Sequence, residues 1–164
     1  MVGPIPPDGI QLRAEREDDG PFLFCLYAST REAELSLVDW SAEQKQTFVT
    51  MQFHAQRQHY RETYPDARFD VIEREGEPIG RICVLTRDDE IRVVDIALVP
   101  ASRSHGLGTA LMSALLDQAA STQRRVTMHV ARFNPALRLY QRLGFRPIED
   151  KGAYFLMEAR PLPR

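Results

Sequence analysis

Short alternating segments predict that the first part of the chain is rich in β-structure. The segments in which apolar and polar positions alternate, or in which apolar residues run together, are 10–16, 68–73, 78–86 and 91–99. Such segments are typical of strands. Turn residues at Gly76 and at Asp88–Asp89 separate the last three of them, so we expect an antiparallel meander.

Two helices are expected between the first strand and this meander. Pro21 suits the first turn of a helix, which we expect to run to about residues 28–32. Ser41 and Gln44 have the spacing of a capping box, and Pro65 ends the helix that follows them. The apolar face expected for this second helix consists of Phe48, Met51 and Ala55.

Helices and strands alternate in the last part of the chain. Apolar spacing predicts a helix over about residues 107–120 and a strand over 126–131. Asn134 is a good N-cap, and Pro135 a good first residue, for a short helix that stops at Gly144. Two further strands are expected around Phe145 and over 154–157. We therefore expect an α/β fold with a mixed sheet: an N-terminal antiparallel meander with two helices, then a β-α-β-α-β crossover half.

Composition agrees with one folded domain and excludes several classes of protein. The 164 residues suffice for one domain over 1–164, with a core at about 8–159 and short proline-containing tails. A net charge of -2 argues against a nucleic-acid binder. No apolar run approaches the roughly 20 residues that cross a bilayer. Cys25, Cys83 and the histidines show no metal-ligand spacing. We expect a cytoplasmic protein with no metal, no nucleic-acid partner and no membrane contact.

The turn before the helix at 107–120 carries the clearest chemical signal. Gly106 and Gly108 stand where the first amides of a helix lack internal partners and the peptide dipoles attract an anion. Such a turn suits phosphate or pyrophosphate. The segment lacks the Lys-Ser/Thr pair of a P-loop, and Leu111 stands where a dinucleotide fingerprint has its third glycine. The alternative interpretation is a glycine turn that only allows close packing of the helix.

Residues 132–145 carry a second signal. A capped helix that begins at Asn134 would hold Tyr140 as a half-buried phenol. In the alternative interpretation, Tyr140 is only a core residue and Asn134 only a helix cap.

Together, the two segments resemble the GNAT superfamily of acetyl-CoA-dependent N-acetyltransferases. Arg103, Gly106 and Gly108 match the family's Arg/Gln-x-x-Gly-x-Gly/Ala signature. The residues that approximate its second signature, Asn-x-x-Ala-x-x-Leu-Tyr-x-x-x-Gly-Phe, are Asn134, Ala136, Leu139, Tyr140, Gly144 and Phe145, with the alanine one position early. The resemblance covers about residues 8–159 and implies a GNAT-like sheet with splayed central strands.

The resemblance implies transfer of an acetyl group from acetyl-CoA to a primary amine by direct attack. Residues 104–109 would wrap the pyrophosphate of coenzyme A, and the strand at 96–98 would pair with its pantetheine arm. The cofactor-binding residues implied in this way are Ile96, Ala97, Leu98, Arg103, Ser104, His105, Gly106, Leu107, Gly108, Thr109 and Asn134. Tyr140 would donate a proton to the departing thiolate.

The base that deprotonates the amine has two candidates. His129 has a pKa range suited to this task, and Asp95 lies on the strand that would hold the cofactor. Their alternative roles are a partly buried histidine with a hydrogen-bond partner and an ion-paired carboxylate.

The acceptor is expected near the link between the first two helices. Glu34 and Asp39 would attract a cationic amine, and Trp40 would form an apolar wall. The alternative is an acidic surface loop with Trp40 anchored in the core. The acceptor is either an amine-bearing small molecule or a protein or peptide, and we expect a monomer or homodimer. The alternative function is a non-catalytic acyl-CoA-binding sensor or partner module of the same fold.

Overall fold

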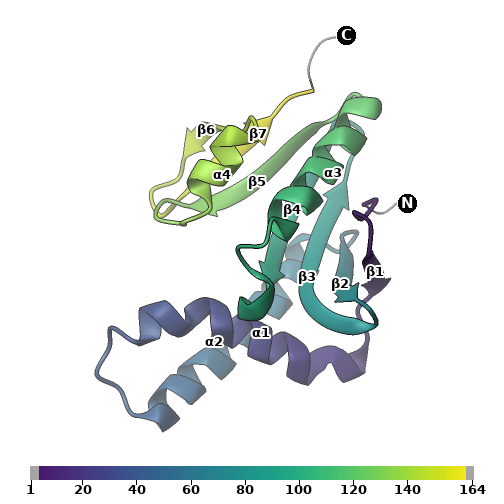
Figure 1. Ribbon diagram of the computed structural model, residues 1–164. Helices are drawn as coiled ribbons and strands as arrows, with labels where there is room; N and C mark the ends of the chain where they lie inside the picture. The colour runs from purple at the N-terminus through teal and green to yellow at the C-terminus, as the bar shows by residue number, and fades with distance from the viewer. Residues whose placement is uncertain (1–3, 162–164) are drawn as a thin grey trace.

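The sheet of this protein has seven strands in the order β1-β2-β3-β4-β5-β7-β6 (Figure 1). A computed structural model describes residues 4–161. The strands are β1 (Ile10–Ala14), β2 (Arg68–Arg74), β3 (Glu77–Thr86), β4 (Glu90–Leu98), β5 (Arg125–Ala131), β6 (Arg146–Asp150) and β7 (Tyr154–Ala159). The helices are α1 (Gly20–Leu35), α2 (Ala42–Thr63), α3 (Leu107–Ser121) and α4 (Leu137–Arg142), with short 3-10 turns at Glu17–Asp19 and Pro100–Ser102. α3 and α4 lie in front of the sheet in Figure 1, and α2 lies behind it.

Strands β1 to β4 form the predicted antiparallel meander. Gly80 of β3 lies opposite Leu98 at the end of β4. A Cβ atom at Gly80 would clash with the carbonyl oxygen of Ala97. Glycine therefore allows β3 to approach closely the last residues of β4.

Helices α1 and α2 pack against each other beside the meander. Leu23 and Tyr27 of α1 form a buried cluster with Val49 and Phe53 of α2. The predicted capping box is confirmed at the start of α2. The Ser41 hydroxyl accepts from the Gln44 amide at 3.1 Å, and the Gln44 side chain accepts from the Ser41 amide at 2.9 Å.

The predicted apolar face of α2 is wrong. Val49 and Phe53 are the residues buried from α2, whereas Met51 is 60% exposed and Ala55 is exposed. α2 carries apolar residues on two sides, and the pair spaced by four residues faces α1. Packing between the helices decides which side is buried, and periodicity within α2 alone does not.

The central strands β4 and β5 are parallel and stay together for only part of their length. Pairing runs from Glu90 with Arg125 to Val93 with Met128. Beyond these residues the two halves of the sheet separate and form an open V (Figure 1). The splayed mixed sheet predicted from the resemblance is confirmed.

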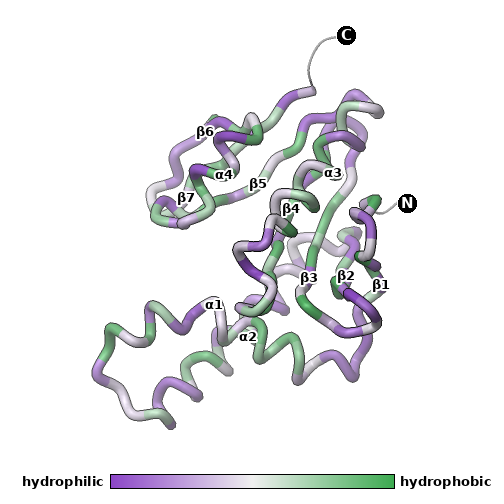
Figure 2. Tube along the Cα trace, viewed as in Figure 1, coloured by the Kyte–Doolittle hydropathy of each residue, from purple (hydrophilic) through white to green (hydrophobic). Residues whose placement is uncertain are grey.

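Buried polar residues hold the closed end of this V. The Thr127 hydroxyl donates to Glu90 Oε2 at 2.6 Å, and Arg92 Nε donates to the same hydroxyl at 2.7 Å. Hydrophobic positions concentrate on the central strands and on α3 (Figure 2), where the main core lies. The hydrogen bonds among Glu90, Arg92 and Thr127 cross from β4 to β5, and they therefore fix where these two strands part.

No helix within residues 4–161 is long and apolar enough to cross a membrane.

The short helix α4 begins later than predicted. Its first residue is Leu137 and its N-cap is Ala136, not Asn134. The Asn134 side chain instead accepts from the Ala136 amide at 2.8 Å and forms a turn before the helix. The predicted stop is confirmed, because Gly144 has φ 101° and the Phe145 amide donates to the Tyr140 carbonyl at 3.0 Å.

Candidate active site

An irregularity in β4 lies directly beside the point where the strands part. Cys83 of β3 pairs with Asp95, but its neighbour Val84 pairs with Val93, so Val94 is an extra residue in β4. Such a bulge re-aims the backbone and side chains that follow it. Asp95 and His129 are the first residues beyond the parting whose side chains carry acid–base chemistry.

The last residues of β4 keep one edge free of strand partners. Ile96, Ala97 and Leu98 pair with β3 on one side. On the other side, pairing with β5 ends at Val93. Within the described residues, the β5-facing edge of this segment therefore has no strand partner, and an extended ligand can add to it as a strand does.

The turn before α3 has the backbone geometry of an anion site. Ser104 has φ 63°, and Gly106, the N-cap of α3, has φ 78°. The first amide bonded within the helix is that of Ala110, which donates to the Gly106 carbonyl at 3.0 Å. The preceding amides, including that of Gly108, point out of the helix end. A Cβ atom at Gly108 would meet nothing within 4 Å, so this backbone is open to a ligand.

Arg103 has a second role that the signature does not indicate. Its Nε donates to the Leu98 carbonyl at 2.8 Å, and its Nη2 donates to the Ser29 hydroxyl at 2.9 Å. The side chain therefore ties the turn to the end of β4 and to α1. Ser104 and His105 are exposed beside it.

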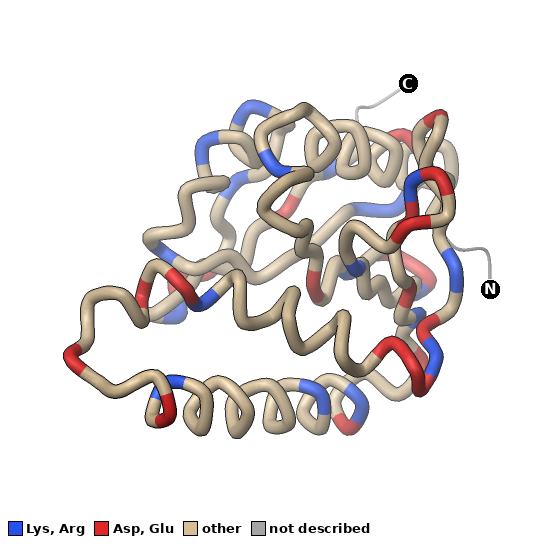
Figure 3. The backbone as a smooth tube through the Cα atoms, turned by 60° about the horizontal axis from the view of Figure 1, so that its bottom comes forward, with Lys and Arg blue, Asp and Glu red and all other residues tan. Residues whose placement is uncertain are grey.

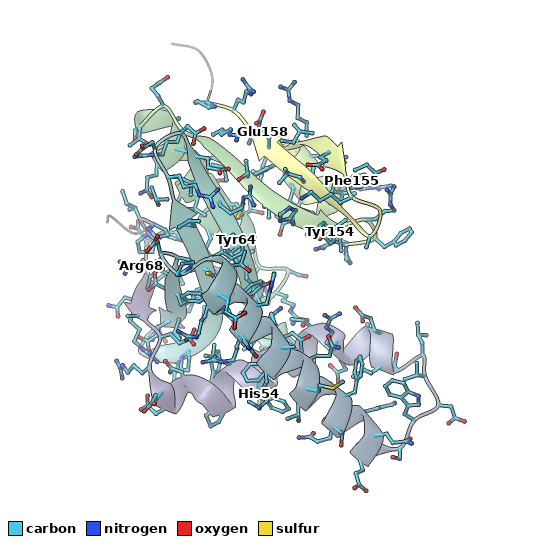
Figure 4. The ribbon with its side chains drawn as sticks, turned by 180° about the vertical axis from the view of Figure 1, so that it is seen from behind. His54, Tyr64, Arg68, Tyr154, Phe155 and Glu158 are labelled. Atoms are coloured by element: carbon cyan, nitrogen blue, oxygen red, sulfur yellow. The ribbon has the colours of Figure 1, made fainter. Side chains whose placement is uncertain are left out.

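A cavity of about 480 Å³ opens where β4 and β5 part. Residues of α1, α2, β4, β5, α4 and β7 line it, and all five tyrosines of the chain are among them. Its polar and aromatic lining residues are Tyr27, Arg31, Gln52, Gln56, His59, Tyr60, Tyr64, Asp95, His129, Asn134, Tyr140 and Tyr154. Figure 4 shows Tyr64 at the end of α2 and Tyr154 at the start of β7, across the opening from one another.

Asp95 occupies the β4 wall of this cavity. Its carboxylate lies 3.6 Å from Nε of Arg81, whose side chain is only 6% exposed. Burial raises the pKa of Asp95, while the Arg81 charge and a hydrogen bond from the Ile96 amide lower it in part. Asp95 is thus an ionisable group with a pKa moved toward the neutral range.

Tyr140 reaches the cavity from α4. Its ring is buried and packs edge-on against Phe145, with centroids 6.0 Å apart. Burial raises the pKa of the phenol, and the negative charge of Asp95 raises it further. The hydroxyl therefore keeps its proton at neutral pH and is available as a donor.

His129 is a further titratable residue beside the point where β4 and β5 separate. It is exposed overall, and its ring lies edge-on to that of Tyr154, with centroids 5.3 Å apart. Partial burial lowers the pKa of His129, as do the positive charges of Arg92 and Lys151. The imidazole is therefore neutral at pH 7 and able to accept a proton.

The residues expected to bind the acceptor do not line this cavity. Glu34 is paired with Arg31 at 3.2 Å, and Asp39 is exposed. Trp40 is 41% exposed and packs on Phe48, with ring centroids 5.3 Å apart, in a separate shallow groove along α2. Within residues 4–161, no group of three His, Cys, Asp or Glu side chains is arranged to hold a metal ion.

Several cavity residues were not identified from the sequence. Tyr27, Arg31, Tyr60 and Tyr64 come from α1 and α2, and Tyr154 from β7. No local motif marks them, because tertiary packing brings them together. The one feature of the sequence that most of these positions share is the residue type, since all five tyrosines of the chain line the cavity.

Comparison with known proteins agrees with this geometry. A family model described as "Acetyltransferase (GNAT) family" matches residues 34–145. PaiA N-acetyltransferase from Thermoplasma acidophilum, solved in complex with coenzyme A, has a TM-score of 0.68 and 16% identity over 92% of this chain and 98% of that one. An acetyltransferase from Thermus thermophilus has a TM-score of 0.64 and 20% identity over 93% and 97%.

A third similar structure is Ard1 from Thermoplasma volcanium, with a TM-score of 0.59 and 19% identity over 94% of this chain and 99% of that one. At these identities the structures show a shared fold. The family model spans most of the chain, and the open sheet agrees with it. The chain therefore belongs to the GNAT family and is an acetyl-CoA-dependent N-acetyltransferase.

Proposed function

We propose that acetyl transfer takes place in the cavity at the parting of β4 and β5, with Asp95 as the base and Tyr140 as the acid. One observation carries this proposal. The free edge of β4, a partly buried carboxyl group and a protonated phenol all border the same opening. Acetyl-CoA enters along β4, and the amine enters from the side of α1 and α2.

The backbone supplies most of the cofactor site in this proposal. Amides at the start of α3, from residues 106–109, bind the pyrophosphate, since the helix end offers donors and a positive dipole there. The pantetheine arm adds to the edge of Ile96–Leu98 as an extra strand, which brings its thioester to Tyr140. Asn134, which lines the same cavity, borders the pantetheine.

The acceptor must lose a proton before it attacks. An amine with a pKa of about 10.4 is neutral in roughly one molecule per thousand near pH 7, and this costs about 4 kcal/mol of barrier. Asp95 takes one proton from the ammonium group and passes it to solvent, with His129 beside the exit. The neutral nitrogen then attacks the acetyl carbon, and the carbon–sulfur bond breaks. Tyr140 protonates the thiolate and recovers a proton from the acylated nitrogen.

The pH profile of thiol release from acetyl-CoA tests the role of Asp95. Since only the carboxylate accepts a proton, kcat/KM falls as the pH drops through the pKa of Asp95, which burial places above its ordinary 3.8. Asp95→Asn removes this acidic limb and lowers kcat/KM by about 10²-fold. Arg81→Met removes the charge that lowers the pKa of Asp95, so the limb moves to higher pH.

Arg74→Met is the matched control, because Arg74 is exposed on β2, away from the cavity. The limb should stay in place in this variant. An acidic limb that survives in Asp95→Asn but disappears in His129→Gln would assign the base to His129 instead.

A further inference from the structure

We infer that the acceptor is a free amino acid, held by its ammonium group at Asp95 and by its carboxylate at Arg31. This inference rests on the proposed function, because it names the substrate class of the same cavity. The charged residues that line the cavity support the inference. Among the lining residues, Arg31 of α1 is the one arginine or lysine and Asp95 of β4 is the one carboxylic acid, and their ionised forms are opposite in sign.

Arg31 is held in place by the wall of the cavity. Its Nε donates to the Tyr27 hydroxyl at 3.0 Å, and its guanidinium carbon lies 5.4 Å from the centre of the Tyr27 ring. Tyr27 itself is buried between α1 and α2. A guanidinium fixed in this way is suited to bind a carboxylate with two parallel hydrogen bonds, because little side-chain freedom remains to be lost.

The remaining donors of Arg31 are available for a ligand. Nη1 reaches both carboxylate oxygens of Glu34 at 3.2 Å. Within residues 4–161, no hydrogen bond is found for Nη2. The charged residues of α1 all lie at this C-terminal end of the helix, beside the start of α2 (Figure 3).

Glu34 therefore competes with the acceptor and does not recruit it. Its side chain is 67% exposed, and such solvent-exposed pairs contribute little. A substrate carboxylate inside the cavity is less solvated and takes the place of Glu34 on Arg31. This reverses the effect expected from the sequence, in which the negative charge of Glu34 attracts a cationic amine.

The rest of the lining fits a small polar molecule. The hydroxyls of the tyrosines, the amides of Gln52 and Gln56, and the imidazole of His59 offer further hydrogen bonds to a ligand. A volume of about 480 Å³ lies within the range of about 300–1,000 Å³ that holds small ligands. The cavity thus accommodates one amino acid, with its amine directed to the parting of the strands.

The test compares free L-amino acids with their carboxamides, which keep the amine and the side chain but lose the negative charge. Thiol release from acetyl-CoA is measured for each compound. For the best amino acid, kcat/KM should exceed that of its amide by about 10- to 100-fold, the effect of one or two hydrogen bonds to a charged group. In Arg31→Gln this preference should fall to about 1, with the rate for the amide little changed.

A second variant of α1 tests whether Glu34 competes with the substrate or recruits it. Glu34→Gln removes the side chain that competes with the substrate carboxylate for Arg31. It should lower KM for the amino acid about 2- to 5-fold, because a solvent-exposed ion pair such as Arg31–Glu34 contributes only a small free energy. A rise of KM in Glu34→Gln would overturn the inference and support recruitment by Glu34. Glu32→Gln, at an exposed position on the same helix, is the matched control and should leave KM unchanged.

Binding separates this inference from the proposed function. The same compounds are titrated into enzyme saturated with coenzyme A and followed by calorimetry. Affinity that depends on the carboxylate and on Arg31 upholds the inference even if Asp95 is not the base. Equal binding and acetylation of amino acids, amides and simple amines overturns it while acetyl transfer stands. Binding of no amino acid overturns it as well.

Discussion

Gly108→Val should raise the dissociation constant of acetyl-CoA by about 10²-fold. The valine side chain would project from the start of α3 into the open space where the pyrophosphate approaches the amides. The expected loss of about 2.7 kcal/mol corresponds to one or two charge-assisted hydrogen bonds. Titration calorimetry with acetyl-CoA measures it directly.

The fold should tolerate this change. Gly108 is helical, its Cβ position is free, and valine has a somewhat better helix propensity than glycine. Ser121→Val, at the opposite end of α3, serves as the control and should leave cofactor affinity unchanged. Wild-type affinity in a folded Gly108→Val protein would contradict the placement of the cofactor.

Tyr140→Phe should lower kcat by about 10²-fold, because the thiolate would leave without a proton from the phenol. Phenylalanine keeps the ring and its contact with Phe145. The free energy of unfolding should therefore change by only about 1 kcal/mol, the scale of one net hydrogen bond. Affinity for acetyl-CoA should change much less than kcat, since the hydroxyl acts in the transition state.

Single-turnover kinetics provide the control for Tyr140→Phe, because they report the chemical step and exclude product release. Thermal unfolding of the same preparation shows whether the fold is retained. A single-turnover rate equal to that of the wild type would remove Tyr140 from the mechanism and leave it a core residue.

Features that depend on residues close together in the sequence were predictable. The meander follows from alternation between turn residues, and the capping box of α2 needs only Ser41 and Gln44. The left-handed stop at Gly144 and the glycine turn before α3 are likewise local. These features, with the two signatures, led to the correct fold and family.

Features that depend on tertiary packing were not predictable in the same way. The buried side of α2 depends on where α1 lies, so Val49 and Phe53 could not be separated from Phe48 and Met51. The start of α4 depends on which amide the Asn134 side chain binds. Segments from most of the chain contribute residues to the lining of the cavity. No spacing of residues in the sequence predicts that these segments lie side by side.

A titration of acetyl-CoA into isotopically labelled protein, followed through the backbone amide resonances, shows directly where the cofactor binds. We expect the largest shifts at residues 104–109 and at Ile96–Leu98, the segments that should contact the pyrophosphate and the pantetheine arm. Residues of the groove around Trp40 should shift little. If the largest shifts fall at that groove and the amides of Leu107–Thr109 do not move, the cofactor does not bind at the start of α3.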